Sequence, residues 1–380
     1  MPDKKKKIAI IIPKYGMAGG AERFAAIVTE KIAENPRYDI HVLANRWTSS
    51  SNAITFHRIP IIPFPRFLTS ITFAWFANRA AARLGCELIH THDRILHADI
   101  FTMHGVPHEF WVKKIRHKRM SLYDSMLSFV EKKLLRNPHC KVLQPVSTLA
   151  RNQYQRIFPA IGGKIHVLHP GIDLESFHPR NRELHRHLVR EKFGFAESDF
   201  VILFVGMNFE LKGLRTLIAS LPQAQAQVLH KGNLRLLVAG KGNQQRYERL
   251  AEELGVREAI RFAGTCNEKE MKTLYAAADL HALLSDFDTF GMTVLEAMAT
   301  GIPVLISPMV GAKDFVLDGI QGYIVDQHDT KAVAERIVFL LDKAKRMKMG
   351  LAARQAAENH SWDLVAQKIS RIYDEILATK

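Results

Sequence analysis

The stretch from residue 285 to residue 307 constrains the fold of this chain more than any other. Polar residues and Gly291 lead into an apolar run at 294–299, and Gly301-Ile302-Pro303 ends that run. The apolar, largely β-branched residues 304–306 that follow are typical of a buried strand. The stretch therefore predicts a loop, a helix of about three turns and then a strand of a parallel sheet.

Short apolar strands alternate with helical segments along the rest of the chain, as a parallel α/β protein requires. At 380 residues the chain is too long for one ordinary core, so we expect two domains. Apolar residues at helical spacing over 364–376 predict a closing helix. The expected strands are 8–13, 40–44, 88–92, 142–146, 165–168, 201–205 and 234–239, and further helices are expected at 21–34 and 216–221.

Two carboxylates lie in the helical part of the stretch. Asp288 lies just before the predicted helix, and Glu296 lies eight positions further on, inside it. Gly291 removes a side chain near the helix N-terminus, where backbone N–H groups without internal partners favour a phosphate. The alternative is a solvated amphipathic helix whose two acids are only surface charge.

Three further motifs follow predicted strands. The Gly-rich turn that contains Gly19 and Gly20 would let a substrate approach the backbone. Lys212 lies beside Gly213 after the strand at 201–205, where an ammonium group can neutralise a diphosphate. His104 ends an apolar strand, a position where ligands bind at the sheet edge in doubly wound folds. A purely structural histidine is the alternative.

Composition excludes several classes of protein. With 47% hydrophobic and 24% charged residues, the chain has the make-up of a soluble globular protein. Cys86, Cys140 and Cys266 are scattered, which predicts no disulfide framework and fits a reducing cytosol. The apolar segments at 8–12 and 67–82 are too short for a signal peptide and for a membrane span, respectively. We therefore expect a cytoplasmic protein without a transmembrane anchor.

The formal net charge of +15 is concentrated in the first half of the chain. Residues 1–170 hold 26 Lys and Arg against 11 Asp and Glu, whereas residues 171–380 hold 27 of each. A half with that excess is expected to seek an anionic partner. The densest basic run, which follows Phe110 and Trp111, comprises Lys113, Lys114, Arg116, Lys118 and Arg119.

Basic residues beside aromatic ones suit an anionic membrane surface, where cations meet headgroups and Trp lies at the interface. Nucleic acid is the weaker alternative, because the sequence has no zinc spacing, RRM-type aromatic motif or helix-turn-helix motif. A merely solvated basic face is the third possibility. His90, His92 and Asp93 also admit a metal site, although two histidines in a strand more often share one face at its end.

The segment that begins at Asp288-Thr-Phe-Gly-Met-Thr-Val-Leu-Glu296 resembles the Glu-x7-Glu signature of the family 4 retaining glycosyltransferases. Those enzymes have the GT-B fold, in which two Rossmann-like domains with parallel sheets face each other. Asp288 departs from the pattern, because the family usually has Glu there. The resemblance runs from about residue 8 to residue 376, and it is strong in the second half and loose in the first.

The resemblance implies a domain organisation. Residues 1–168 plus 362–380 would form an acceptor-binding Rossmann-like domain, and residues 169–361 would form a nucleotide-sugar-binding one. The segment from His169 to Pro179 is similar to the family's connector between the domains, and the final helix would cross back onto the first domain.

The resemblance also implies roles for single residues. Lys212 and the helix N-terminus would stabilise the departing diphosphate, Asp288 would orient the sugar, and His104 would lie near the reacting sugar. Gly19, Gly20 and Arg23 would form a loop against the phosphates and the acceptor. The residues that would bind the donor are Glu296, through the ribose hydroxyls, with Phe290, Gly291, Met292, Gly206, Gly264 and Thr265.

One position departs from the family's cationic motif after the strand at 201–205. Met207 stands where the family usually has Arg, so half of the cationic clamp is absent, or Arg215 or Arg23 supplies it from elsewhere. Because Lys212 and the helix dipole can balance the leaving charge, no metal and no other cofactor is expected.

The implied function is retaining transfer of a sugar from a nucleotide-sugar, most simply one like UDP-glucose. The acceptor would be a lipopolysaccharide core or another cell-envelope glycan at the cytoplasmic membrane face, since the segments 104–111 and 127–135 resemble lipopolysaccharide core glucosyltransferases of type I. The alternatives are a GT-B nucleotide-sugar epimerase and a non-catalytic, membrane-docked subunit that binds a nucleotide-sugar.

Overall fold

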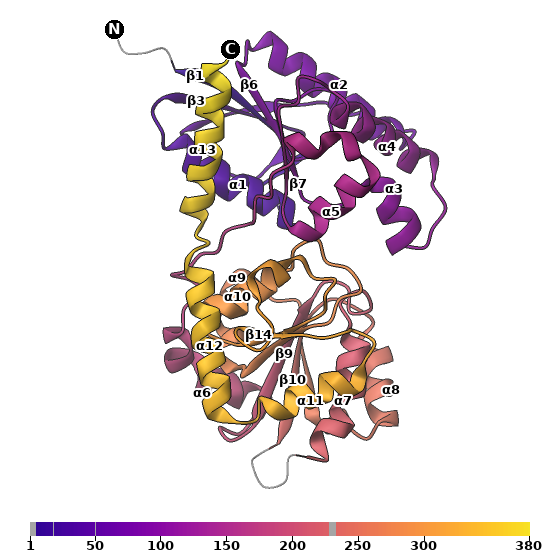
Figure 1. Ribbon diagram of the computed structural model, residues 1–380, viewed down its shortest axis with the longest axis vertical. Coiled ribbons are helices and arrows are strands. Elements are labelled where there is room, and N and C mark those ends of the chain that lie inside the picture. Colours follow the sequence, from indigo (N-terminus) through magenta and orange to yellow (C-terminus); the bar gives the residue numbers. More distant parts are fainter. Residues whose placement is uncertain (1–4, 18, 50, 228–232) are drawn as a thin grey trace. The chain divides into compact units, whose positions relative to one another are not determined.

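The computed structural model describes residues 5–17, 19–49, 51–227 and 233–380 (Figure 1). The chain divides into two compact units. Unit 1 comprises Met1–Gly171 and Trp362–Lys380, and unit 2 comprises Ile172–Ser361. The sequence places the first of these boundaries after residue 168 and the second before residue 362.

Unit 1 is built on a six-stranded parallel sheet. Its strands are β1 (Lys6–Ile11), β3 (Tyr38–Ala44), β5 (Ile54–Arg58), β6 (Leu88–Thr91), β7 (Ile100–Met103) and β8 (Val142–Pro145). They lie in the order β5-β3-β1-β6-β7-β8, with Ile8 beside both Ile40 and Leu88. A parallel sheet is covered on both faces, which is why its strands are apolar along most of their length.

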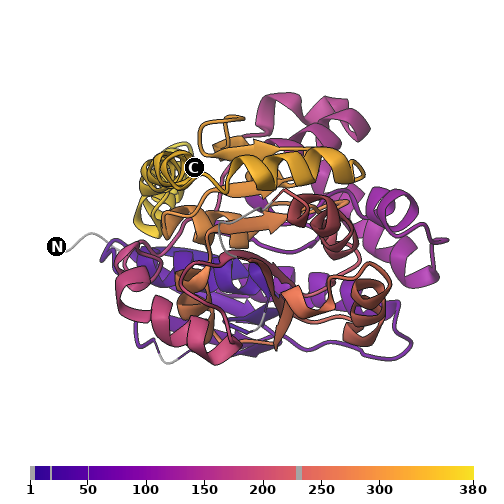
Figure 2. The same cartoon turned by 90° about the horizontal axis from the view of Figure 1, so that it is seen from below.

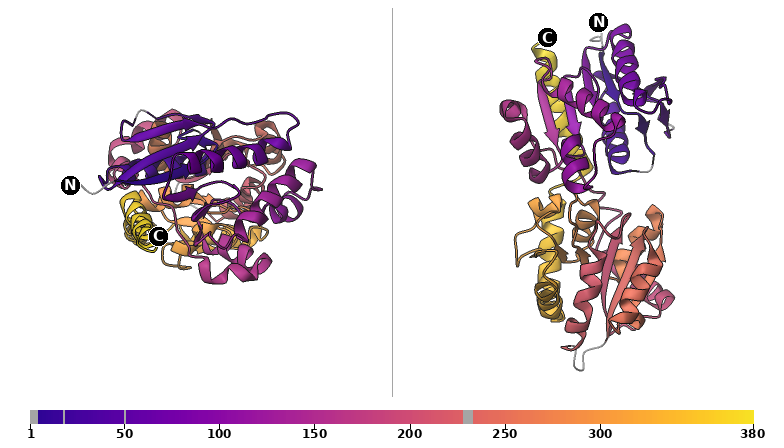
Figure 3. Two further views of the ribbon diagram at one scale, coloured as in Figure 1. Left: turned by 90° about the horizontal axis from the view of Figure 1, so that it is seen from above. Right: turned by 90° about the vertical axis from the view of Figure 1, so that its right-hand side faces the viewer.

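Helices cover both faces of this sheet (Figures 1 and 3). On one face, α2 (Leu68–Arg83), α4 (Leu122–Leu135) and α5 (Thr148–Ile157) share a buried apolar cluster with Ala9, Ile11 and Leu143 of the sheet. On the other face lie α1 (Gly20–Ala33) and α13 (Trp362–Ala378), which contact each other. The two ends of the chain therefore complete the same unit.

Polar contacts fix α13 on unit 1. The Tyr38 hydroxyl donates to the Asp374 carboxylate at 2.6 Å, and Lys31 on α1 pairs with Asp363 at 2.6 Å. These contacts join residues more than 330 positions apart. The expected return of the last helix to the first domain is confirmed.

Unit 2 repeats the architecture of unit 1 with a second six-stranded parallel sheet (Figure 2). Its strands are β9 (Phe200–Gly206), β10 (Leu234–Gly240), β11 (Ile260–Gly264), β12 (Leu280–Leu283), β13 (Val304–Ile306) and β14 (Gly322–Ile324). Their order is β11-β10-β9-β12-β13-β14. Its longer helices are α6 (Arg180–Phe193), α7 (Leu214–Gln225), α8 (Gln244–Glu253), α9 (Glu268–Ala277), α10 (Met292–Ala299), α11 (Thr330–Phe339) and α12 (Lys343–Glu358).

The core of unit 2 explains which helical faces are apolar. Leu217 on α7, Tyr247 on α8 and Ile337 on α11 lie in one buried cluster with Ile202 and Val238 of the sheet. The two Rossmann-like units with parallel sheets give the expected GT-B fold class.

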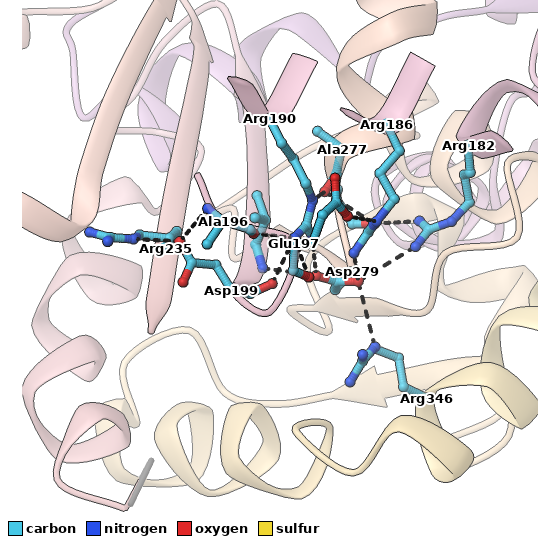
Figure 4. A network of polar contacts seen from close by, with 12 residues as sticks. Arg182, Arg186, Arg190, Ala196, Glu197, Asp199, Arg235, Ala277, Asp279 and Arg346 are labelled. Carbon is cyan, nitrogen blue, oxygen red and sulfur yellow. Dashed lines mark hydrogen bonds and ion pairs between the residues drawn. The ribbon is translucent and has the colours of Figure 1, made fainter. Parts of the chain in front are cut away.

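A network of arginines lies at the amino end of β12 (Figure 4). It comprises Asp279, directly before β12, with Arg182, Arg186 and Arg190 on α6 and Arg346 on α12. The closest contact joins Arg190 to Asp279 at 2.6 Å. Burial alone would raise the pKa of Asp279, but the charges of Arg186 and Arg190 hold it below its ordinary value. The network fixes α6, the first helix of unit 2, to the sheet.

Three sequence-based expectations about elements are wrong. The expected strand at 165–168 is reduced to one isolated bridge between Ile165 and Leu143, although His166 and Leu168 still donate to β8 carbonyls. The helix α10 has eight residues, about two turns rather than three. Part of the expected loop after β1 is the short strand β2 (Lys14–Tyr15), which pairs with β4 (Arg46–Trp47).

Candidate active site

The carboxyl ends of β9 and β12 mark the place where a ligand can approach the sheet of unit 2. From these adjacent strands, β10 and β11 continue to one side and β13 and β14 to the other. Ligands of open parallel sheets bind beyond the carboxyl ends of the strands at such a reversal of strand order. The segment after β9 carries Lys212, and the segment after β12 carries Asp288.

Lys212 and Asp288 meet at this point. The Lys212 ammonium group and the Asp288 carboxylate form an ion pair, and their side chains are only 20% and 18% exposed. Gly206, the last residue of β9, makes room for the lysine, because a Cβ at that position would lie 2.9 Å from Lys212 Cγ. Two of the residues predicted to be catalytic, 76 positions apart in the chain, are thus in direct contact.

The helix α10 begins at Met292, four residues after Asp288, and no side chain of the described residues caps its N-terminus. Gly291 is the N-cap residue, with φ at 91°, and a Cβ there would lie 2.8 Å from Val310 Cγ1. Phe290 packs on Phe315 with ring centroids 5.7 Å apart, and Met292 in the first turn is half-buried. An uncapped N-terminus beside a lysine is suited to an anion such as a phosphate.

Glu296 lies on the second turn of α10 and is 8% exposed, so the alternative of a solvated helix with two surface acids is wrong. The hydroxyl of Tyr275 on α9 donates to Glu296 Oε2 at 2.8 Å and lies 3.2 Å from the Thr293 carbonyl oxygen. Burial and then the Glu296 charge raise the pKa of Tyr275 well above its ordinary value, so this hydroxyl stays protonated. Sequence reasoning missed Tyr275, because nothing in the sequence joins α9 to α10.

The other positions of unit 2 that the sequence singles out lie after β9 and at the end of β11. Gly264 and Thr265 are exposed at the carboxyl end of β11, the edge strand. Met207, which stands in the place of an arginine, is 69% exposed. Arg215 lines a separate pocket of about 380 Å³ together with Arg246 of α8.

Two carboxylates of unit 2 have a spacing that metal sites also use. Asp286 and Asp288 have an Asp-x-Asp spacing, in which two carboxylates could share a divalent cation. However, Asp288 pairs with Lys212, and Asp286 lies 3.7 Å from His328. In the part of the chain that the structure describes, no cluster of three or more His, Cys, Asp and Glu side chains could hold a metal ion.

Unit 1 has a pocket of about 620 Å³ at the carboxyl ends of β1, β6 and β7. His104, directly after β7, forms part of its wall. Gly19 and Gly20 are exposed at the start of α1, and Glu22 in the first turn lines the pocket, whereas Arg23 is half-buried. The charged side chains and histidines of the lining are Lys14, Glu22, Arg66, His92, Asp93, Arg94 and His104.

The histidines beneath the pocket are held by the protein. His90 bonds the Tyr373 hydroxyl at 2.6 Å through Nδ1 and the Thr102 hydroxyl at 2.8 Å through Nε2. His92 Nδ1 and His104 Nε2 lie 3.1 Å apart. Burial lowers the pKa of His104 to about 3, and burial and then His90 and His104 lower that of His92 well below its ordinary value. Both rings are therefore neutral at physiological pH.

The basic run follows a short helical turn on unit 1. It begins in the π-helical turn η1 (Trp111–Ile115), and all five predicted cations are exposed: Lys113, Lys114, Arg116, Lys118 and Arg119. Lys113 pairs with Glu109 at 2.7 Å. Exposed apolar side chains lie on the neighbouring helices, Leu122 and Phe129 on α4 and Trp75 on α2. No helix within the described residues is both long and apolar enough to cross a membrane.

Two known protein families match consecutive parts of the chain. The "Glycosyltransferase Family 4" family matches residues 18–176, and the "Glycosyl transferases group 1" family matches residues 186–356. The chain is 27% identical over 337 residues to an uncharacterized glycosyltransferase of Methanocaldococcus jannaschii, with 85% of each chain covered. It is 34% identical over 221 residues to the D-inositol 3-phosphate glycosyltransferase of Corynebacterium efficiens. That match covers 56% of this chain and spans about half, 51%, of the relative.

Solved structures are similar over nearly the whole chain. WaaG, a glycosyltransferase involved in lipopolysaccharide biosynthesis, has a TM-score of 0.78 at 21% identity, with 96% of this chain and 99% of WaaG covered. Anabaena HepE in complex with UDP-glucose has a TM-score of 0.71 at 18% identity, with coverage of 97% and 99%. At such identities the likeness shows the fold, which is GT-B. Together with the family matches, it identifies this chain as a glycosyltransferase with the GT-B fold.

Proposed function

We propose that this protein is a family 4 retaining glycosyltransferase that moves a sugar from a nucleotide-sugar, most simply UDP-glucose, to a cell-envelope glycan. The contact between Lys212 and Asp288 beside the uncapped N-terminus of α10 carries this proposal. It brings a cation, oriented N–H groups and a carboxylate to one place, as transfer from a sugar diphosphate requires. The structure of HepE with UDP-glucose supports the choice of donor.

Each group has a task in this reaction. The Lys212 ammonium group and the N–H groups of α10 stabilise the negative charge that grows on the departing diphosphate. Asp288, which pairs with the lysine, accepts hydrogen bonds from sugar hydroxyls. Glu296, oriented by the Tyr275 hydroxyl, accepts from the ribose hydroxyls. Because the lysine and the helix balance the leaving charge, the proposal includes no metal.

The acceptor binds in the pocket of unit 1. Its volume of about 620 Å³ admits a sugar ring, and the carboxylates Glu22 and Asp93 offer acceptors for hydroxyl groups. The structural likeness to WaaG supports a lipopolysaccharide core acceptor. The exposed cations at 113–119 and the apolar side chains on α2 and α4 suit an anionic membrane surface and support the proposed location at the cytoplasmic membrane face.

The test is donor consumption by the purified chain over a panel of nucleotide-sugars, with the anomeric configuration of the product read by NMR. One donor should be consumed with retention, and Glu296→Gln should lose most of that activity. The matched control is Glu335→Gln on the exposed face of α11, which should keep it. Binding without consumption would favour a non-catalytic subunit, for which the exposed Met207 is the supporting observation. An epimerised nucleotide-sugar as product would favour an epimerase.

A further inference from the structure

His92 and His104 form a pair whose hydrogen-bonding state the structure restricts. His92 Nδ1 lies 3.1 Å from His104 Nε2, and Phe24 packs against both rings, at centroid distances of 5.8 Å and 4.9 Å. Both rings are neutral, so each carries one proton on one of its two nitrogens. One nitrogen of the contact must donate and the other must accept. The pair therefore has two possible arrangements.

The second nitrogen of His92 decides between them. His92 is 5% exposed, and its Nε2 atom is sealed from solvent with no hydrogen-bond partner in the described part of the chain. If His92 carried its proton on Nε2, an N–H donor would be buried without an acceptor, and such orphaned donors are rare in proteins. The favoured arrangement has the proton on Nδ1 of His92, where it is donated to His104.

The consequence falls on the atom of His104 that can meet a ligand. Since His104 Nε2 accepts from His92, the neutral His104 ring carries its own proton on Nδ1. The described residues offer Nδ1 no hydrogen-bond partner, and the ring forms part of the wall of the 620 Å³ pocket. A neutral N–H group is thus directed to a ligand oxygen.

We propose that His92 is a positioning residue that fixes the tautomer of His104, so that His104 serves the bound sugar as a neutral hydrogen-bond donor and not as a proton acceptor. The role of this donor in turnover rests on the proposed function, whereas the tautomer does not. His90 cannot replace His92 as the hydrogen-bond donor to His104, because both ring nitrogens of His90 already bond the hydroxyls of Tyr373 and Thr102.

Nitrogen NMR of the full chain, labelled with ¹⁵N-histidine, tests the tautomer without any substrate. His104→Gln assigns the His104 signals among those of the 18 histidines. We expect His104 of the wild-type chain to be protonated on Nδ1. In His92→Phe, which keeps a ring but lacks the donor, His104 should revert to the Nε2-protonated form that free imidazole side chains prefer. In His92→Asn, whose amide can donate from a similar place, the Nδ1-protonated form should persist.

Wild-type His104 protonated on Nε2, or an unchanged tautomer in His92→Phe, would overturn the proposal. With the donor that the panel identifies, His92→Phe should lower kcat about tenfold with little change in the donor KM, as the loss of one neutral hydrogen bond predicts, and His92→Asn should restore kcat. Unchanged kcat in His92→Phe would show that the fixed tautomer is unused. If no donor is consumed, the proposed function fails while the NMR result still decides the tautomer.

Discussion

Units 1 and 2 have the same architecture and different chemistry at the same edge of their sheets. Beyond the strand ends of unit 2, Lys212 and Asp288 form a charged pair beside a helix N-terminus. Beyond those of unit 1, two neutral histidines line a pocket of about 620 Å³. The parallel sheet decides where a ligand meets each unit, and the residues after the strands decide which ligand chemistry is possible there.

The overall charge differs in the same way. The excess of positive charge lies within the first 170 residues, whereas the remaining residues balance. Unit 2 holds four arginines in the network around Asp279, whereas the basic run of unit 1 is exposed. The few paired charges of unit 2 suit the proposed donor site, and the many exposed cations of unit 1 suit the proposed contact with a membrane.

The largest expected effect separates the stability of the two units. Asp279→Asn removes the acid from the arginine network and should destabilise unit 2 by about 3–5 kcal/mol, because buried guanidinium groups lose their partner. All four tryptophans, at 47, 75, 111 and 362, lie in unit 1. The urea concentration at the midpoint of unfolding should therefore fall when circular dichroism follows the transition. It should stay unchanged when tryptophan fluorescence follows it. Equal shifts by both probes would contradict the separation.

The same substitution carries a pH dependence. The folded chain holds the pKa of Asp279 below that of an unfolded aspartate, so the wild-type advantage over Asp279→Asn is complete above about pH 4. It should decline as the pH falls further, through the lowered pKa of the folded state. The unfolding midpoints of the wild-type protein and of Asp279→Asn, measured between pH 7 and pH 3, give this difference. A difference that does not change with pH would contradict the lowered pKa of Asp279.

Removing the cation of the proposed donor site should affect catalysis and leave folding intact. Lys212→Ala should lower kcat about 100- to 1,000-fold, because the diphosphate loses charge stabilisation in the transition state. Lys212→Arg should keep part of the rate. Lys348→Ala on the exposed face of α12 is the control and should match the wild-type chain. A loss smaller than threefold in steady-state assays would remove Lys212 from the mechanism.

A smaller effect is expected where α13 meets the sheet of unit 1. Tyr373→Phe leaves His90 Nδ1 buried without its partner and should destabilise unit 1 by about 1–3 kcal/mol. This time tryptophan fluorescence should report the shift. The control is Tyr323→Phe, which changes a buried tyrosine of β14 in unit 2 and should leave the unfolding transition seen by fluorescence unchanged. The reverse pattern would mean that α13 contributes little to unit 1.

The smallest effect concerns the surface charge of unit 1. Arg119→Ser should weaken binding to vesicles that contain anionic lipid by about fivefold, roughly 1 kcal/mol, and should not change binding to zwitterionic vesicles. Lys348→Ser in the balanced unit 2 should bind as the wild-type chain does. Co-sedimentation measures both, and equal losses in the two variants would reduce the basic run to a solvated face.

Much of the fold could be predicted because a buried parallel strand is an apolar run in sequence. The strands β1, β3, β6, β8, β9, β10 and β13 fall within or beside the expected ranges. The missed strands carry a weaker signal. β5 contains Thr55, His57 and Arg58, β12 has only four residues, and β14 has three residues and begins with Gly322. The segment 165–168 has the apolar residues of a strand, but it pairs with β8 through one isolated bridge only.

The candidate site could be predicted where one side chain follows one strand. Lys212 and His104 were predicted because each follows an expected strand and has glycine nearby, and Asp288 was predicted because it lies just before an expected helix. Contacts between elements carry no such signal. Tyr275 reaches Glu296 because α9 lies beside α10, and His92 reaches His104 because β6 pairs with β7. Such pairs depend on packing and register, which only the folded chain defines.

The placement of α13 in unit 1 affects the order in which the two units can fold during translation. Unit 2 is continuous from Ile172 to Ser361, so all of its residues are available before translation finishes. Unit 1 begins before unit 2 but is completed after it, because Tyr373, the partner of His90, lies in α13, which follows unit 2 in the chain. Domains usually fold in order of synthesis, with the N-terminal one first, and here that order is reversed. The side of the unit 1 sheet that carries His90 stays uncovered until α13 has been synthesised.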